Sequence, residues 1–127
     1  MLYHKDIFLP AKVVERFCGK TFKLNFSRHA QSQCTEDRYG VINPPKSISF
    51  SISNIIEVET APSGIVIKLV VRMPYDGVYD ISIAFMPELG IGEGLVKTIW
   101  KNKIEDSHQT LNHGVYCSRS LHDKVCT

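Results

Sequence analysis

Alternation of hydrophobic and polar residues is clearest in the second half of the chain. Four stretches rich in valine and isoleucine are separated by turn-forming residues, including those at 62–64 and 74–77. These stretches are residues 54–60, 64–73, 78–86 and 95–102. Short connections between neighbouring strands favour antiparallel pairing. The pattern therefore predicts a four-stranded antiparallel meander.

The start of the chain predicts a short helix. Val13, Val14 and Phe17 form an apolar stripe at helical spacing. Pro10 suits a first helical position, and Gly19 suits the position just after a helix end. We therefore expect one short amphipathic helix between these two residues.

A strand that passes directly into a polar helix is predicted next. Residues 22–26 alternate between apolar and polar side chains, which indicates a half-buried strand. Ser27 is a suitable N-cap for a helix of about three turns that ends near residues 39–40. Residues 47–53 alternate isoleucine and phenylalanine with serine and predict a further extended segment.

These elements predict an α+β fold in which N-terminal helical segments pack on an antiparallel sheet. A chain of 127 residues with 43% hydrophobic and 22% charged residues is ordinary for one soluble domain. We place this domain at residues 1–117, with a possible short helix within 103–117. Residues 118–127 are expected to form a flexible tail.

The meander strands suggest which residues share a face. The odd positions of 65–71 and of 81–85 are all apolar, so we expect them to face the core. Aligning these two sets places Arg72 opposite Asp80 on the other face, where they would form an ion pair. The same face would carry Lys68 and Lys97, and these cations with Arg72 predict a positive stripe that could bind phosphate.

Residues 26–30 read "FSRHA" at the predicted change from strand to helix. With Arg38 downstream and Thr98 in a late strand, this motif resembles the RelE-like small toxins. These belong to the barnase–EndoU–colicin–RelE group of metal-independent ribonucleases. A second segment, residues 96–116, is similar to small phage-encoded proteins of unknown role. The resemblance implies a RelE-like fold and RNA as partner, free or ribosome-associated, with no cofactor.

Ribonuclease chemistry of this kind needs a base for the ribose 2′-OH, an acid for the departing 5′-oxygen, and a cation beside the phosphate. His29 is the candidate acid or base, because histidine ordinarily titrates near neutral pH. His108 or His113 would supply the second proton-transfer group. No metal is required by this scheme.

Arginine suits the role of phosphate clamp because its planar guanidinium donates two parallel hydrogen bonds. Arg72 is the first candidate for this role, and Arg28 or Arg38 could take its place. Thr98 completes the expected catalytic set. The residues expected to contact RNA or phosphate are Arg28, Lys68, Lys97 and Trp100.

Each of these residues also has a structural interpretation. His29 could pack at the junction of strand and helix, and Arg38 could serve the C-terminal end of the helix dipole. Thr98 alternates with Val96 and Trp100, which would turn it toward the core. A core-facing Thr98 could not share a pocket with Arg72 on the opposite face.

Two other functions remain open on the sequence. A non-enzymatic phage accessory protein could bind a host protein or a nucleic acid through an exposed strand edge. The acidic and histidine residues of 105–113 could instead bind a divalent metal, although this composition also suits a solvated loop. The net charge of +2 permits a nucleic-acid partner without requiring one.

The cysteines and the chain start indicate the expected compartment. No cysteine pair has the CxxC spacing, so we expect free thiols in a reducing environment; a zinc site of Cys34, Cys117 and His113 fits no standard spacing. The four cysteines are Cys18, Cys34, Cys117 and Cys126. No apolar run is long enough to cross a bilayer, and the first ten residues do not read as a signal peptide. The expected location is the cytoplasm, that of the host if the protein is phage-encoded.

Overall fold

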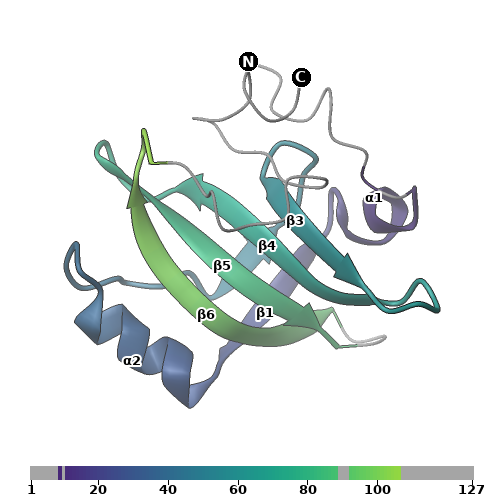
Figure 1. Ribbon diagram of the computed structural model, residues 1–127, viewed down its shortest axis with the longest axis horizontal. Helices are drawn as coiled ribbons and strands as arrows, with labels where there is room; N and C mark the ends of the chain where they lie inside the picture. The colour runs from purple at the N-terminus through teal and green to yellow at the C-terminus, as the bar shows by residue number, and fades with distance from the viewer. Residues whose placement is uncertain (1–8, 10, 89–91, 107–127) are drawn as a thin grey trace.

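The computed structural model describes residues 9, 11–88 and 92–106 (Figure 1). Two helices and six strands follow one another along these residues. They are α1 (Ala11–Phe17), β1 (Thr21–Phe26), α2 (Arg28–Glu36), β2 (Ser47–Ser49), β3 (Ile55–Thr60), β4 (Val66–Pro74), β5 (Tyr79–Pro87) and β6 (Glu93–Lys103). The fold is α+β, as the sequence predicts.

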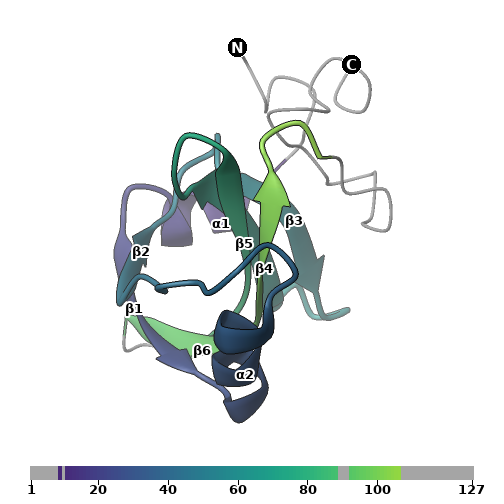
Figure 2. The same cartoon turned by 90° about the vertical axis from the view of Figure 1, so that its left-hand side faces the viewer.

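All six strands belong to one curled sheet, in the order β2-β1-β6-β5-β4-β3 (Figure 2). Strands β3 to β6 form the predicted antiparallel meander. The sheet continues past β6, because β1 pairs with it in parallel and β2 then pairs with β1. The expectation of a purely antiparallel sheet is therefore wrong. Pairing between strands so far apart in sequence leaves no local pattern of residues that would predict it.

The main core lies on one face of this sheet and draws residues from both helices and all six strands. Four phenylalanines lie at its centre, and their contacting rings have centroids 5.3–5.7 Å apart. They are Phe17, Phe22, Phe50 and Phe85. Tilted and edge-on ring pairs at this spacing add specific attraction to the burial of apolar area.

The local signals in the first half of the chain form the predicted elements. Val13 and Phe17 are the buried residues of α1, and Gly19 follows with φ of +80°. Ser27 caps α2, because its Oγ accepts a hydrogen bond from the Ala30 amide at 3.0 Å. The helix ends at Glu36, before the predicted residues 39–40, because the next residue already has extended backbone angles.

The register of β4 and β5 differs from the predicted one by two residues. Arg72 lies opposite Ser82, and Asp80 lies opposite Pro74. A slip of two residues keeps every side chain on its face. The predicted ion pair therefore still forms, diagonally, with Arg72 Nε 2.9 Å from Asp80 Oδ2.

The predicted core face of β4 is wrong at its start. Lys68 pairs with Glu59 while Val66 pairs with Thr60, so Ile67 is an extra residue in a β-bulge. Val66 is consequently buried, whereas Ile65 and Ile67 are 51% and 38% exposed. After the bulge the side chains alternate as predicted, and Leu69 and Val71 face the main core.

Leu69 and Ile67 were predicted to share the core face, but because of this bulge Leu69 is buried and Ile67 is exposed. Leu69→Ala is expected to lower the free energy of unfolding by about 2–5 kcal/mol, because Leu69 is fully buried. Ile67→Ala, the matched control, is expected to cost less than about 1 kcal/mol. Urea denaturation of both variants measures the difference. Equal losses would contradict the bulge.

Candidate functional site

Helix α2 runs along the edge of β6 that β1 leaves open (Figure 1). The parallel pairing of β1 with β6 ends at Phe26 and Val96. There the chain turns away at Ser27, whose amide donates to Val96 O at 3.1 Å. The Ser27 hydroxyl donates to Lys97 O at 3.2 Å. The helix thus takes the place that a further stretch of strand would occupy.

Side chains of Gln33 and Asp37 accept hydrogen bonds from β6 amides that would otherwise donate to a neighbouring strand. The Ile99 amide donates to Gln33 Oε1 at 2.9 Å, and the Lys101 amide donates to Asp37 Oδ1 at 3.1 Å. Buried backbone amides require acceptors. This requirement accounts for Gln33 in the helix and for Asp37 at its C-cap.

A groove of about 440 Å³ lies between α2 and β6. We call it the α2–β6 groove, and its volume is in the range of small-molecule sites. It is lined by His29, Ser32, Gln33, Glu36, Asp37, Arg38, Trp100 and Lys101. Three residues selected from the sequence, His29, Arg38 and Trp100, therefore meet in one groove.

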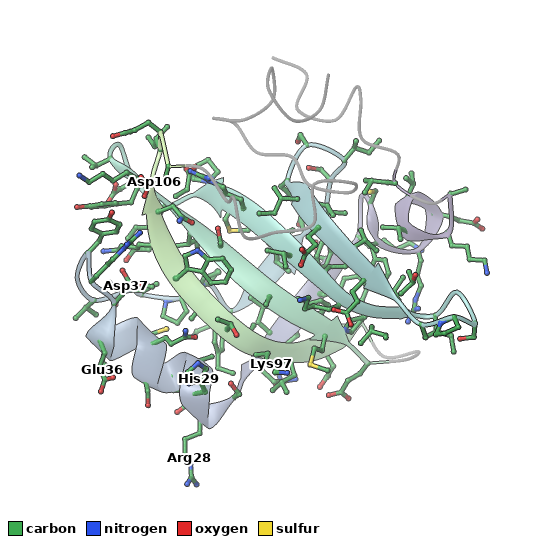
Figure 3. The ribbon with its side chains drawn as sticks, in the orientation of Figure 1. Arg28, His29, Glu36, Asp37, Lys97 and Asp106 are labelled. Carbon is green, nitrogen blue, oxygen red and sulfur yellow. The ribbon has the colours of Figure 1, made fainter. Side chains whose placement is uncertain are left out.

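Glu36 is a groove residue that the sequence reasoning missed. His29, Ser32 and Glu36 follow the spacing i, i+3, i+7, which places them on one face of a helix. Figure 3 shows Glu36 near one end of α2 and His29 near the other. The heptad spacing of a histidine and a carboxylate is the signal in the sequence that could have found this pair.

Arg38 and Trp100 provide a cation and an aromatic surface. The side chain of Arg38 is 70% exposed; its guanidinium stacks 4.6 Å from the Tyr39 ring centroid and lies 3.9 Å from Asp106 Oδ2. Trp100 is half-buried and packs against a small apolar cluster of Ile56, Val70 and Ala84. The indole is thus held in position in the same groove as a largely exposed guanidinium.

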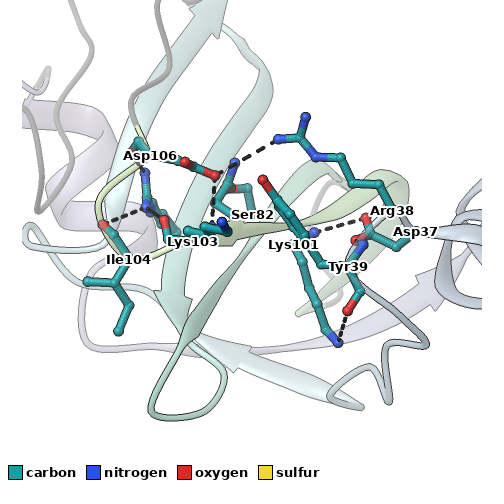
Figure 4. A network of polar contacts seen from close by, with 10 residues as sticks. Asp37, Arg38, Tyr39, Ser82, Lys101, Lys103, Ile104 and Asp106 are labelled. Atoms are coloured by element: carbon teal, nitrogen blue, oxygen red, sulfur yellow. Dashed lines mark hydrogen bonds and ion pairs between the residues drawn. The ribbon is translucent and has the colours of Figure 1, made fainter.

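Lys101 also lines the groove but has a structural role. It is 6% exposed, and its Nζ donates to Tyr39 O at 3.3 Å (Figure 4). The same ammonium lies 5.0 and 5.1 Å from the ring centroids of Tyr75 and Tyr79. Such contacts hold a buried cation among aromatic rings. Asp37 is similarly engaged, since its second oxygen accepts from the Tyr39 amide.

Arg72, the first candidate for the phosphate clamp, is buried and bound by the protein itself. Besides the Asp80 contact, its Nη1 donates to Asp106 O at 2.8 Å. Its Nη2 donates to Lys103 O at 2.9 Å and to Ile104 O at 3.1 Å. These bonds fasten β4 to the end of β6, and Arg72 is 5% exposed. We therefore assign Arg72 a structural role and exclude it from the groove.

Two of the three cations of the expected positive stripe are paired with carboxylates of the protein and are not available to bind phosphate. Lys68 Nζ lies 3.4 Å from Glu57 and 3.5 Å from Glu59, and Arg72 is paired with Asp80. Carboxylates on β3 and β5 therefore offset two of the three cations. Lys97 of β6 is exposed and lies near the N-terminal end of α2 (Figure 3).

The alternative interpretation of Thr98 as a core-facing residue is wrong. Ala84 pairs with Thr98 while Phe85 pairs with Val96, so Lys97 is an extra residue in β6. This bulge reverses the alternation of side chains along β6, so that Val96 faces the main core while Thr98 and Trp100 share the other face. Thr98 is half-buried there and does not line the groove. Arg28, at the first position of α2, points away from the sheet (Figure 3).

Several sequence expectations fall outside the described residues. These are the second proton-transfer candidates, two cysteines, the short helix and the tail: His108, His113, Cys117, Cys126, most of residues 103–117, and residues 118–127. Within the part that the structure describes, no group of three or more histidine, cysteine or acidic side chains is arranged to hold a metal ion.

The two described cysteines, Cys18 and Cys34, are free thiols. Burial raises the pKa of both above the ordinary value for a thiol, and the negative charge of Asp37 raises the pKa of Cys34 further. A raised pKa makes the reactive thiolate scarcer at neutral pH. Both therefore fit structural positions rather than a nucleophilic site.

Comparison with known proteins finds no matching family model, no similar curated protein and no similar solved structure. The resemblance to RelE-like ribonucleases accordingly stays a prediction. Neither described helix has the length and apolar character needed to span a bilayer.

Proposed function

We propose that the protein engages single-stranded RNA in the α2–β6 groove and cleaves it without a metal, in the manner of RelE-like ribonucleases. The observation that carries this proposal is the meeting of His29, Glu36, Arg38 and Trp100 in one groove. A histidine and a carboxylate can transfer protons, and a guanidinium and an indole can bind the phosphate and the base of RNA.

The groove offers separate contacts for the base and for the phosphate. A nucleobase would stack on the indole of Trp100, which the apolar cluster beneath it holds in place. The exposed guanidinium of Arg38 would donate paired hydrogen bonds to a phosphate. Arg28, at the other end of α2, and Lys97 of β6, which lies close to that end (Figure 3), would contact the continuing RNA strand.

The proposed cleavage uses the ribose 2′-OH as nucleophile. The Glu36 carboxylate takes the 2′ proton as the 2′-oxygen bonds to phosphorus, and the bond from phosphorus to the 5′-oxygen breaks. Protonated His29 gives its proton to that 5′-oxygen, which leaves a cyclic phosphate on the other product. Arg38 stabilises the charge on the phosphate. DNA lacks the 2′-OH and would be bound but not cut.

RNA affinity tests the binding half of the proposal. Arg38→Ala is expected to weaken binding of a short oligouridylate about fivefold. It should also reduce the magnitude of the slope of log affinity against log salt by about 0.7, because one phosphate contact to a single strand is lost. Fluorescence polarisation of labelled RNA measures both. Lys46→Ala is the control, since Lys46 is exposed and lies outside the groove. Equal affinity in both variants would count against the groove.

A non-enzymatic accessory protein is the second candidate. Of the two cations that line the groove, Arg38 is exposed and Lys101 is buried. A single exposed cation favours binding more than it favours charge stabilisation in a cleavage step. This role predicts RNA or protein binding with no RNA cleavage.

A further inference from the structure

A second groove lies between α1 and the turn that joins β3 to β4. We call it the basic groove; its volume is about 470 Å³. It is lined by Lys12, Glu15, Arg16, Lys20, Ser63, Gly64, Ile65 and Val66. Figure 1 shows α1 and α2 at opposite ends of the sheet, so this groove is separate from the α2–β6 groove.

The basic groove carries three cations and one carboxylate. Lys12 and Lys20 are exposed, and the guanidinium of Arg16 lies 4.9 Å from the Phe17 ring centroid, which fixes its position. No described carboxylate lies within 4.0 Å of any of these cations. The surface therefore presents a net positive charge that the described part of the protein leaves unpaired.

The β3–β4 turn brings an apolar side chain to the same surface. Gly64 has φ of +90°, and its amide donates to Ala61 O at 2.8 Å, which closes the turn. Lys12 reaches across from α1, because a side chain at Gly64 would begin 3.2 Å from its Nζ. Ile65 follows the turn and is 51% exposed. An exposed isoleucine thus lies among the cations.

We propose that the basic groove docks an acidic segment of a partner protein that carries a large apolar side chain. Carboxylates of the segment would pair with Lys12, Arg16 and Lys20, and its apolar side chain would cover Ile65. A nucleic acid fits this surface less well, because the groove has no aromatic lining residue on which a base could stack. The proposal is independent of the RNA-binding function assigned to the other groove.

Peptide titration tests this docking surface. The probe is the capped peptide Glu-Glu-Leu-Glu-Glu, and amide NMR spectra of the whole protein report where it binds. We expect saturable shifts at Lys20, Ser63, Gly64 and Ile65. The matched peptides Gln-Gln-Leu-Gln-Gln and Glu-Glu-Gly-Glu-Glu, which lack the charges or the leucine, are expected to bind more weakly.

Substitutions at exposed residues test the charged part and the apolar part of the basic groove separately. Lys12→Glu is expected to weaken binding about fivefold, since it turns an attraction into a repulsion, whereas Lys46→Glu makes the same charge change elsewhere and should not. Ile65→Ser should weaken binding, and Ile52→Ser, at another exposed isoleucine, should not.

Any one of four results would overturn the proposal. The glutamine peptide could bind as tightly as the glutamate peptide, or Lys12→Glu could leave affinity unchanged. Oligouridylate or inorganic phosphate could shift the same amides at lower concentration than the acidic peptide, which would make the groove a phosphate site. Absence of any saturable shift with the acidic peptide would equally reject it.

Discussion

Asp80→Ala is expected to lower the free energy of unfolding by about 3–5 kcal/mol, because it removes the carboxylate that faces a buried guanidinium. Asp80 is fully buried and Arg72 is 5% exposed, with Nε and Oδ2 2.9 Å apart. A charge left without its counter-ion inside the protein cannot regain its hydration. The loss should appear in urea denaturation monitored by circular dichroism.

The exposed ion pair of Arg38 and Asp106 is the matched control. Its atoms are 3.9 Å apart and Arg38 is 70% exposed, so Arg38→Ala should cost less than about 0.5 kcal/mol. The double variant Arg72→Met with Asp80→Leu should regain only part of the loss. It leaves no buried charge, but the carbonyls of Lys103, Ile104 and Asp106 lose their donor. If Asp80→Ala costs no more than Arg38→Ala, the structural role assigned to Arg72 is wrong.

His29→Ala is expected to slow RNA cleavage by about 10²–10⁴-fold, the usual contribution of a general acid. Glu36→Gln should cause a loss of similar size, because it removes the proposed base. Both side chains are exposed, so neither change should lower stability. The measurement is cleavage of a DNA oligonucleotide containing one ribonucleotide, with EDTA present.

Thr35→Ala is the control for this prediction, because Thr35 is an exposed residue of α2 outside the groove lining. An all-DNA oligonucleotide should remain intact. Equal cleavage by the wild type and His29→Ala would remove His29 from the mechanism. Binding without cleavage by the wild type would favour the non-enzymatic accessory role.

The sequence predicted the elements whose signals are local. Ser27 as N-cap and the apolar stripe of Val13 and Phe17 depend on neighbours within one or two helical turns. The ion pair of Arg72 with Asp80 was also predicted, even though the register was not. A slip of two residues preserves the face of each strand and keeps long side chains within reach.

The remaining features depend on single inserted residues and distant pairings. The bulges at Ile67 and Lys97 each reverse the alternation of a strand, which brings Ile65 to the surface and turns Thr98 away from the core. Neither bulge is marked by a glycine or proline. The groove itself exists because β1 stops pairing with β6 at Val96 and α2 continues along the same edge. No local pattern in the sequence predicts that α2 and β6 lie side by side.

Two polar features that looked functional in the sequence serve the fold. Arg72 holds the end of β6 through three backbone carbonyls, and Lys68 is paired with glutamates on β3. Carboxylates within the sheet offset the positive charges of both residues. The exposed cations that line the two grooves lie at its two ends instead, beside α2 and beside α1.

Fluorescence of Trp100 tests the central proposal most directly, because it is the only tryptophan in the chain and lines the α2–β6 groove. Titration with a short oligouridylate should quench the emission to saturation, with the same midpoint as fluorescence polarisation of the labelled RNA. Arg38→Ala should move both midpoints to higher RNA concentration, and Lys46→Ala should move neither. RNA binding that leaves the Trp100 emission unchanged, or no binding of RNA at all, would contradict the proposed groove.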